Sequence, residues 1–397
     1  MEKKRLLYYD IQKHLEHKNA LIITGMRQVG KTTLVKQLLD ELGDKPKLYF
    51  DFDNPLDQRL FEDEEYNNIY RRLATESGAK NNERLYIFLD EIQNFPVVTK
   101  VMKYLTDHYK TKFVVTGSSS FYLRNLFPES LSGRKFLYIL PTLSFKEYLY
   151  FTDAISLEQA REDNLEELLA RTDLFLHKRY EVAYEQYLRW GGFPEVVTTE
   201  DAQTKSMVLR NIFGSFFEKD IQLLSDHSDI RQLRDLILLL VPRVGSMIDV
   251  TKLADALGVD RPKLYSFLDF LQDTFMIKLL PKFSQSIDRS VAGGRKVYFT
   301  DTGLLTAIGN VNDGQLFENA IYNQLSHYGE LSFYNKRNTA EIDFILDKKI
   351  AFEAKLTADS RDVQKAQKLA AALNLEKCYV LSKSYSEKEG IVSAVNL

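Results

Sequence analysis

The chain has 397 residues, which is more than one compact core usually holds, so we expect two or three domains. A formal net charge of −3 and a pI near 6.2 argue against a general affinity for nucleic acid or anionic membranes. The single cysteine, Cys378, excludes an internal disulfide, and the sequence contains no membrane-length apolar run, so we expect a cytoplasmic protein without a membrane partner.

The first part of the chain alternates short apolar runs with helix-like segments. Ala20–Thr24 is apolar and leads into Gly25, and Thr32–Leu42 has apolar residues at helical spacing. Further strand-like runs are Lys47–Phe52, Leu85–Leu89, Phe113–Thr116 and Phe136–Leu140. Buried strands that alternate with helices predict a parallel α/β sheet covered on both faces, which we assign to residues 1–155.

The loop between the first strand and its helix matches the phosphate-binding pattern G-x-x-x-x-G-K-[ST]. Its glycines let backbone N–H groups wrap phosphates, Lys31 reaches the β- and γ-phosphates, and Thr32 ligates Mg²⁺. A glycine-rich turn with a surface lysine is the alternative interpretation. The expected ATP-binding residues are Gly25, Arg27, Gln28, Val29, Gly30, Lys31, Thr32 and Thr33.

A second motif follows the strand Leu85–Leu89. Asp90 would hold Mg²⁺, and Glu91 would orient the attacking water, although two acids can also be a solvated strand end. Ser118 follows the next strand, where its hydroxyl would sense the γ-phosphate or belong to a plain polar turn. The sequence therefore predicts a site for ATP and Mg²⁺.

The rest of the chain divides into three predicted parts. Residues 156–240 are helical and charged, and we expect a helical lid there. Residues 241–305 give helix, turn, helix and two strands, the order of a winged helix-turn-helix. Residues 306–397 give a helix, three strands, a helix and a strand, which predicts a second α/β domain.

A series of motifs carries a family resemblance. Besides the two nucleotide motifs, it comprises Thr116–Ser119, Leu131–Arg134, Leu143–Leu149 and Gly191–Pro194. In this order they resemble prokaryotic AAA-type ATPases that end in a restriction-endonuclease-like domain of unassigned function. The resemblance covers nearly the whole chain and implies the fold and the use of ATP. Near Asp220 that family usually has an arginine, and this chain has Lys219 instead.

The last domain carries a second candidate site. Glu318 lies on its first predicted helix, Asp343 in a strand, and Glu353 and Lys355 at the end of the next strand. This order is similar to the PD-(D/E)xK nuclease fold, in which carboxylates hold Mg²⁺ and a lysine assists an activated water. Glu318, Asp343 and Glu353 are the expected metal ligands. The alternative is a binding module whose charged residues are solvated.

A nuclease would need a local basic surface, and the winged helix offers only Lys252, Arg261 and Lys263. Three basic residues are few for a face that contacts phosphates, so a protein is expected as a partner of this part of the chain as well as DNA. The six histidines lack ligand spacing, so structural zinc is not expected.

Arg134 is the candidate for an arginine finger supplied to a neighbouring subunit, which would require self-association into a homo-oligomer. A local ion pair with Glu129 or Glu147 is the alternative. Three functions stay open: an ATPase that switches an effector domain, an ATP-regulated nuclease acting on DNA or RNA, and a nucleotide-gated binding protein with negligible turnover.

Overall fold

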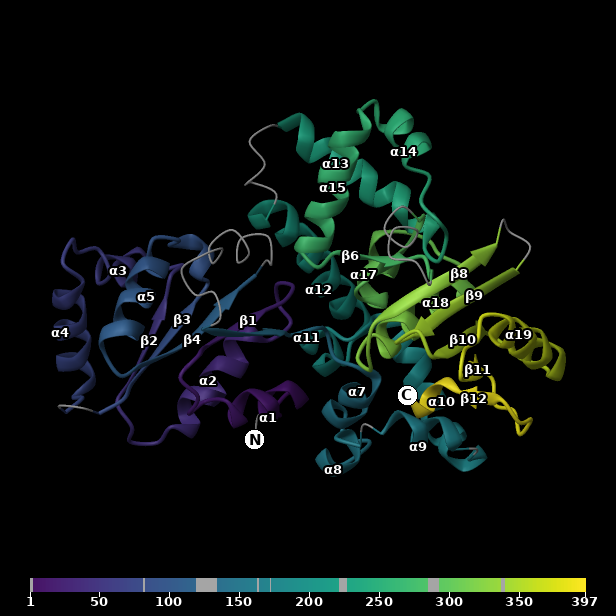
Figure 1. The fold of residues 1–397 in the computed structure, drawn as a ribbon, viewed down its shortest axis with the longest axis horizontal. Coiled ribbons are helices and arrows are strands. Elements are labelled where there is room, and N and C mark those ends of the chain that lie inside the picture. The colour runs from purple at the N-terminus through teal and green to yellow at the C-terminus, as the bar shows by residue number, and fades with distance from the viewer. Residues whose placement is uncertain are drawn as a thin grey trace. The chain divides into compact units, whose positions relative to one another are not determined.

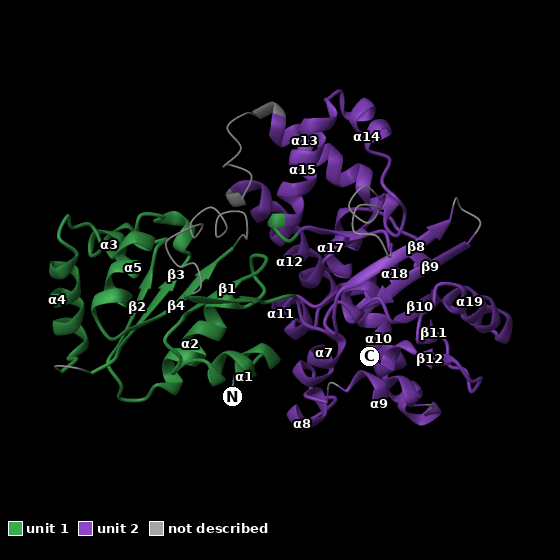
Figure 2. Cartoon of the chain, in the orientation of Figure 1, with its two compact units in different colours: residues 1–141, 273–275 green, residues 142–272, 276–397 purple. Residues whose placement is uncertain are grey.

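The structure is a computed structural model of the chain. It describes residues 3–80, 83–118, 134–162, 164–171, 173–220, 227–284, 293–336 and 340–397. The chain folds into two compact units, residues 1–141 with 273–275 and residues 142–272 with 276–397 (Figure 2). No helix in the described ranges has both the length and the apolar character needed to cross a membrane. The four-part division of the chain stays a prediction.

The first unit is built on a five-stranded parallel sheet with the strand order β2-β3-β4-β1-β5 (Figure 1). Its strands are β1 (Ala20–Thr24), β2 (Lys47–Asp51), β3 (Leu85–Asp90), β4 (Thr111–Gly117) and β5 (Lys135–Ile139). Its helices are α1 (Leu6–Lys13), α2 (Lys31–Glu41), α3 (Pro55–Arg59), α4 (Tyr66–Ser77), η1 (Ile92–Asn94) and α5 (Val98–His108). The carboxyl ends of β1, β3 and β4 meet at one edge, because these strands are parallel and adjacent.

Helices cover both faces of this sheet, as predicted. On one face, alternate residues of β1, β3 and β4 form a core with the apolar sides of α4 and α5, including Ile22, Ile87 and Leu105. Helix α2 contacts β3 and β4 and buries Leu34 and Leu38 outside that core. Strands β1, β3 and β4 are therefore buried on two sides, which explains why most of their residues are apolar rather than alternating with polar ones.

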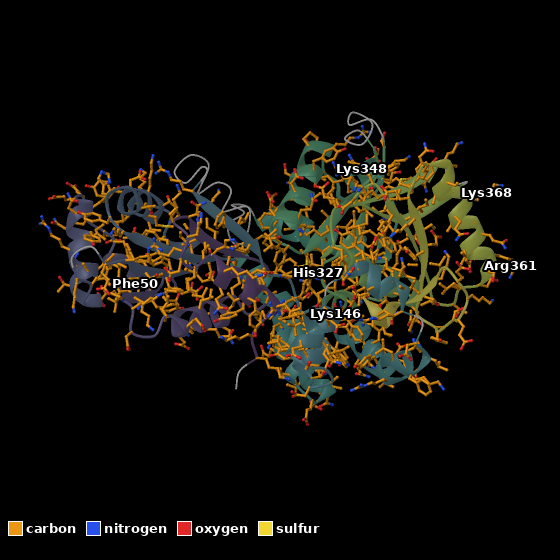
Figure 3. The ribbon with its side chains drawn as sticks, turned by 60° about the horizontal axis from the view of Figure 1, so that its bottom comes forward. Phe50, Lys146, His327, Lys348, Arg361 and Lys368 are labelled. Carbon is orange, nitrogen blue, oxygen red and sulfur yellow. The ribbon has the colours of Figure 1, made fainter. Side chains whose placement is uncertain are left out.

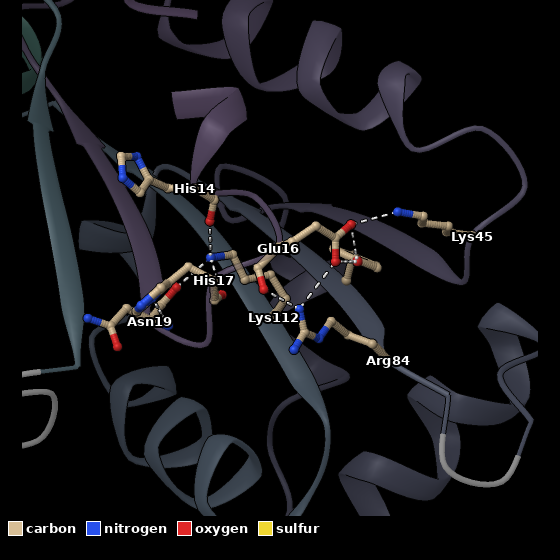
Figure 4. Close-up of polar contacts among 8 residues, drawn as sticks. His14, Glu16, His17, Asn19, Lys45, Arg84 and Lys112 are labelled. Carbon is tan, nitrogen blue, oxygen red and sulfur yellow. Dashed lines mark hydrogen bonds and ion pairs between the residues drawn. The ribbon is translucent and has the colours of Figure 1, made fainter. Parts of the chain in front are cut away.

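A buried lysine fixes the turn that precedes β1 (Figure 4). Lys112 of β4 is 1% exposed, and its ammonium donates to the backbone carbonyls of His14, His17 and Asn19 at 2.9, 2.8 and 2.5 Å. Burial, together with the nearby Arg84, lowers the pKa of Lys112 to about 7. The three acceptors match the three ammonium protons, so this turn is held at the start of the strand that carries the phosphate loop.

The second unit begins with a long helical region. Its helices are α7 (Phe145–Phe151), α8 (Leu157–Ala160), α9 (Leu165–Ala170), α10 (Leu174–Trp190), α11 (Pro194–Thr198), α12 (Ala202–Ser215), α13 (His227–Leu240) and α17 (Thr302–Ile308), with a π-helical turn at η2 (Phe216–Asp220) and a 3-10 turn at η4 (Val241–Arg243). Helices α10 and α12 pack against α17. The assignment of this region as a lid stays a prediction.

The expected helix, turn, helix and hairpin are found after α13. They are α14 (Val250–Leu257), α15 (Arg261–Asp273) and the antiparallel strands β6 (Ile277–Pro281) and β7 (Arg295–Phe299). Helix α14 ends at Gly258 in the left-handed conformation, which stops the helix and turns the chain toward α15. The element order fits a winged helix, and that identity stays a prediction.

The unit ends in a mixed sheet with the order β12-β11-β10-β9-β8. It comprises α18 (Asp313–Leu325), β8 (Leu331–Lys336), β9 (Ala340–Leu346), β10 (Ile350–Lys355), α19 (Ser360–Ala372), β11 (Lys377–Ser382), β12 (Ile391–Ser393) and η5 (Ala394–Asn396). Strands β8, β9 and β10 are antiparallel, whereas β10, β11 and β12 are parallel. Arg361 and Lys368 project outward from α19 (Figure 3).

Candidate functional site

The loop between β1 and α2 has a backbone that requires glycine at its ends. Gly25 has φ +152°, and a Cβ there would lie 2.2 Å from the carbonyl oxygen of Leu140. Gly30 has φ +94° and caps the N-terminus of α2, and Gln28 between them is also left-handed at φ +63°. The loop is therefore a tight turn that leads from the end of β1 to the start of a helix, which is where backbone N–H groups can bind a phosphate.

Lys31 begins α2 and folds back into this loop. Lys31 is only 5% exposed, and its ammonium donates to the carbonyls of Gly25 and Met26, both at 3.0 Å. Of the other expected binding residues, Val29 is buried, Arg27 and Thr33 are half-buried, and Gln28 is exposed. The lysine thus lies at the mouth of the loop, where it can neutralise a bound phosphate.

Asp90 ends β3 and is held by hydroxyl groups. Its carboxylate accepts from Thr32 Oγ1 at 2.7 Å, from the Tyr49 hydroxyl at 2.9 Å, and from Thr116 Oγ1. Burial and the charge of Asp90 raise the pKa of Tyr49, so this phenol stays a donor. Thr32 and Asp90 place two hard oxygen donors side by side, which fits Mg²⁺ completed by phosphate oxygens and water.

Glu91, the next residue, leaves the strand in a left-handed conformation with φ +52°. Its backbone N–H donates to Thr116 Oγ1 at 3.1 Å, and its carboxylate accepts from the amide of Gln93. The same amide group donates to Ser118 Oγ at 3.2 Å. Gln93 therefore links the two predicted polar residues, a role that the sequence analysis did not assign.

Arg5, which no sequence motif indicated, also contacts the phosphate loop. Arg5 is 5% exposed, and its guanidinium donates to the carbonyls of Val29 at 2.8 Å and Pro141 at 2.9 Å. These contacts span 24 and 136 residues, so no local spacing could reveal them. A charged residue just before an amphipathic first helix is the only signal that the sequence gives.

Arg134 lies at the other edge of the sheet. Its carbonyl accepts from the N–H of Ala20 at the start of β1, whereas the phosphate loop follows the end of that strand. Five strand residues span roughly 15 Å, more than an arginine side chain reaches, so Arg134 does not serve the site of its own chain. Its guanidinium pairs with Asp107. Of the two expected partners, Glu147 caps α7, and Glu129 lies outside the described residues.

The four predicted residues of the C-terminal site come together in the second unit. Asp343 Oδ2 accepts from the N–H of Ala354 at 3.0 Å, which places β9 beside the end of β10. Lys355 pairs with Glu353 Oε1 at 2.8 Å. Glu318 of α18 is joined to Asp343 through a lysine that the sequence analysis did not name. We call Glu318, Asp343 and Glu353 the carboxylate centre.

That lysine is Lys296 of β7. Its ammonium lies 3.3 Å from Glu318 Oε1, 3.5 Å from Asp343 Oδ1 and 2.8 Å from Glu341 Oε1, and its side chain is 3% exposed. Tyr298, two residues on along the same strand, donates its hydroxyl to Glu318 Oε1 at 2.7 Å. The alternation of Lys296 and Tyr298 marks one face of a strand, but the sequence does not reveal what this face meets.

The charges of the centre depend on each other. Burial and the negative charge of Asp343 raise the pKa values of Glu318 and Glu353. Burial alone would lower the pKa of Lys296, but Glu318, Asp343 and Glu341 outweigh burial and raise it. Lys296 is therefore charged, and it is the main compensation for the carboxylates it contacts. Across the described ranges, no three Asp, Glu, His or Cys side chains are grouped as a metal site.

The basic residues expected to face DNA are paired with acids in part. Lys263 pairs with Asp229 at 2.7 Å, and Lys252 pairs with Asp249 at 3.5 Å. Arg261 is exposed at the start of α15. Each pair reduces the positive charge of α14 and α15, so the helices offer little attraction for phosphates.

Three segments of the chain match known families. Residues 17–149 match a family described as an AAA domain. Residues 181–315 and 313–397 match two families described as domains of unknown function, DUF8612 and DUF4143. The carboxylate centre joins these two matched segments, because Lys296 belongs to the first and its carboxylate partners to the second.

Similar proteins extend over most of the chain. An uncharacterized protein of Methanocaldococcus jannaschii is 24% identical and covers 98% of this chain and 87% of its own length. An uncharacterized protein of Haemophilus influenzae is 26% identical, with 93% and 90% covered. A solved Walker-type ATPase of Pyrococcus abyssi matches with a TM-score of 0.50 at 14% identity, covering 78% of this chain and 96% of that one. This likeness shows the fold alone.

Proposed function

We propose that the chain binds and hydrolyses ATP with Mg²⁺ and uses the nucleotide state to switch its second unit, which acts on a partner. The observation that carries this proposal is the contact between Thr32 and Asp90, 2.7 Å apart at the start of α2 and the end of β3. Hydrolysis needs a metal ligand on each of the two nucleotide motifs, and this contact joins them.

The roles of the other residues follow from their positions. Lys31 would neutralise the β- and γ-phosphates, while the loop N–H groups bind the remaining phosphate oxygens. Thr32 and Asp90 would hold Mg²⁺, whose charge would offset that of the phosphates. Glu91 would accept hydrogen bonds from the attacking water, with Gln93 setting the direction of its carboxylate and Ser118 lying beside the same amide.

Binding and turnover of ATP test the proposal directly. The full-length protein should bind MgATP and release phosphate, whereas Lys31→Ala should bind with an affinity roughly 10- to 100-fold lower, because a charged hydrogen-bond partner is lost. Calorimetric titration with MgATP measures this change. An unchanged affinity in Lys31→Ala would show that the site is misassigned. Binding without phosphate release would instead support a nucleotide-gated binding protein.

The nuclease alternative depends on the carboxylate centre taking up Mg²⁺. Glu318, Asp343, Glu353 and Lys355 have the residue types that such an enzyme uses. Mg²⁺-dependent cleavage of plasmid or single-stranded DNA that disappears in Asp343→Asn would establish it. The position of Lys296 argues for another use of these carboxylates.

A further inference from the structure

Four oxygen atoms of the carboxylate centre already have partners. Glu318 Oε1 accepts from Tyr298 and Lys296, Asp343 Oδ1 faces Lys296, and Asp343 Oδ2 accepts from the backbone of β10. Glu353 Oε1 pairs with Lys355. One buried oxygen, Glu353 Oε2, has no hydrogen-bond partner. A divalent metal ion needs several oxygens directed at one point, and here an ammonium group receives them.

We propose that the ammonium of Lys296 is the resident cation of the carboxylate centre and takes the position between Glu318 and Asp343 that a divalent metal ion would occupy in a nuclease. The ammonium is a compact charge with three donors, and the three carboxylates within 3.5 Å supply three acceptors. A metal ion placed between Glu318 and Asp343 would face this ammonium at a few ångströms in a buried setting, where repulsion is strong.

The strand that delivers Lys296 is anchored on both sides. Asn319 of α18, which is fully buried, accepts from the N–H of Phe299 and donates to its carbonyl, both at 2.8 Å. The rings of Tyr298 and Tyr322 stack at 4.4 Å between centroids. The ammonium also lies 5.6 Å from the ring centroid of Phe333 in β8. These contacts fix the backbone of β7 against α18 and place the ammonium of Lys296 beside Phe333.

A turn covers the centre from another direction. Gly245, with φ +74°, lies so close to Glu318 that a Cβ there would meet its carboxylate oxygens at 2.8 and 2.9 Å. This turn is tied to β7, since the N–H of Gly245 donates to the carbonyl of Val297 at 3.0 Å. The Gly245 turn therefore packs against Glu318 and is held there by β7.

Mn²⁺ binding by the full-length protein without nucleotide tests the proposal. Free Mn²⁺ is measured by electron paramagnetic resonance for the wild type, Asp343→Asn, Lys296→Met and Lys296→Met/Asp343→Asn. The wild type and Asp343→Asn should bind Mn²⁺ equally. Lys296→Met should gain one site, and adding Asp343→Asn should weaken that site at least about ten-fold. Tyr298→Phe is the matched control, because it removes a hydrogen bond to Glu318 but keeps the ammonium, and it should gain no site.

Two results would overturn the proposal. One is Mn²⁺ binding by the wild type that is lost in Asp343→Asn, which requires no variant at Lys296. The other is a folded Lys296→Met protein that gains no site. If Lys296→Met does not fold, Lys296→Met/Glu341→Gln removes one charge of each sign and keeps Glu318 and Asp343. A folded double variant must then gain Mn²⁺ binding for the proposal to stand.

Discussion

Two buried carboxylates in different units have different partners. Asp90 is 2% exposed and accepts from three hydroxyl groups, whereas Asp343 is 8% exposed and faces the ammonium of Lys296. Hydroxyl groups are neutral, so they stabilise a carboxylate and leave its net charge available to a metal ion. An ammonium cancels that charge. Two centres can therefore contain the same carboxylate residues and differ in whether they can bind Mg²⁺, because the groups that contact the carboxylates differ.

The largest expected difference between the two centres is in how a substitution there changes the rate of ATP hydrolysis. Glu91→Gln should retain MgATP binding and slow ATP hydrolysis by about 10²- to 10⁴-fold, because the amide no longer accepts a proton from water. The same substitution in the other centre, Glu353→Gln, should leave ATP turnover unchanged. Steady-state phosphate release measures both. Equal losses in the two variants would contradict the assignment of the first centre as the site of hydrolysis.

The two buried lysines give the second comparison. Lys296→Met should lower the free energy of unfolding by about 3–5 kcal/mol, because it leaves buried carboxylates without their cation. Lys31→Met leaves the carbonyl acceptors of Gly25 and Met26 behind and should cost about 1–3 kcal/mol.

Denaturant unfolding can follow the second unit by the fluorescence of Trp190, the only tryptophan of the chain. A cost below about 1 kcal/mol for Lys296→Met would mean that the ammonium is not the main compensating charge.

A third buried carboxylate, Asp301, has backbone N–H groups as its partners. Asp301 accepts from the N–H groups of Gly192 at 2.7 Å and Leu304 at 2.9 Å, and burial raises its pKa from 3.8 to about 6 against the effect of these donors. The folded state therefore keeps a proton that the unfolded state loses between about pH 4 and 6. The free energy of unfolding should fall as pH rises through that window, by up to about 3 kcal/mol.

Trp190 lies beside Gly191, whose Cβ would meet the Asp301 carboxylate, so its fluorescence reports on this region. Unfolding curves at several pH values should show the fall in the wild type and a flatter dependence in Asp301→Asn. An identical pH dependence in both proteins would assign the proton to another group.

Substitution of Arg134 is expected to have the smallest effect on stability and ATP turnover. Its pair with Asp107 is exposed, so Arg134→Ala should change stability by less than about 1 kcal/mol and leave ATP turnover nearly unchanged. A finger acting on a second copy predicts instead a loss of about 10³- to 10⁵-fold. Turnover measured against protein concentration, with and without added Lys31→Ala protein, separates the two, because only a finger depends on self-association.

Local patterns located the residues of the candidate nucleotide site, because these residues lie at strand ends and in one loop. The apolar runs located five parallel strands within one or two residues, and parallel strands bring their carboxyl ends together. The strand order did not follow from the sequence, since any order would satisfy the same burial. Strand β12 was also missed because three residues give no measurable alternation.

Only part of the C-terminal centre could be predicted from the sequence. Glu318, Asp343, Glu353 and Lys355 follow an order along the chain that a known fold shares, so they were found. Lys296 reaches the centre from another segment, 22 residues before Glu318 and 47 before Asp343. Its burial contradicts the usual exposure of lysine, and only tertiary contacts can show that carboxylates compensate it.

The amide of Asn319 has a consequence for how this chain can change. Its hydrogen bonds go to the main chain of Phe299, so they fix the position of β7 along its length and do not depend on the side chain at that position. Successive residues of a strand point to opposite faces, and a shift of β7 by one residue would turn Lys296 away from the carboxylates. With Phe299 fixed, an insertion between Val297 and Phe299 would bring the apolar Val297 to the position of Lys296, whereas a deletion there would bring Arg295 to it.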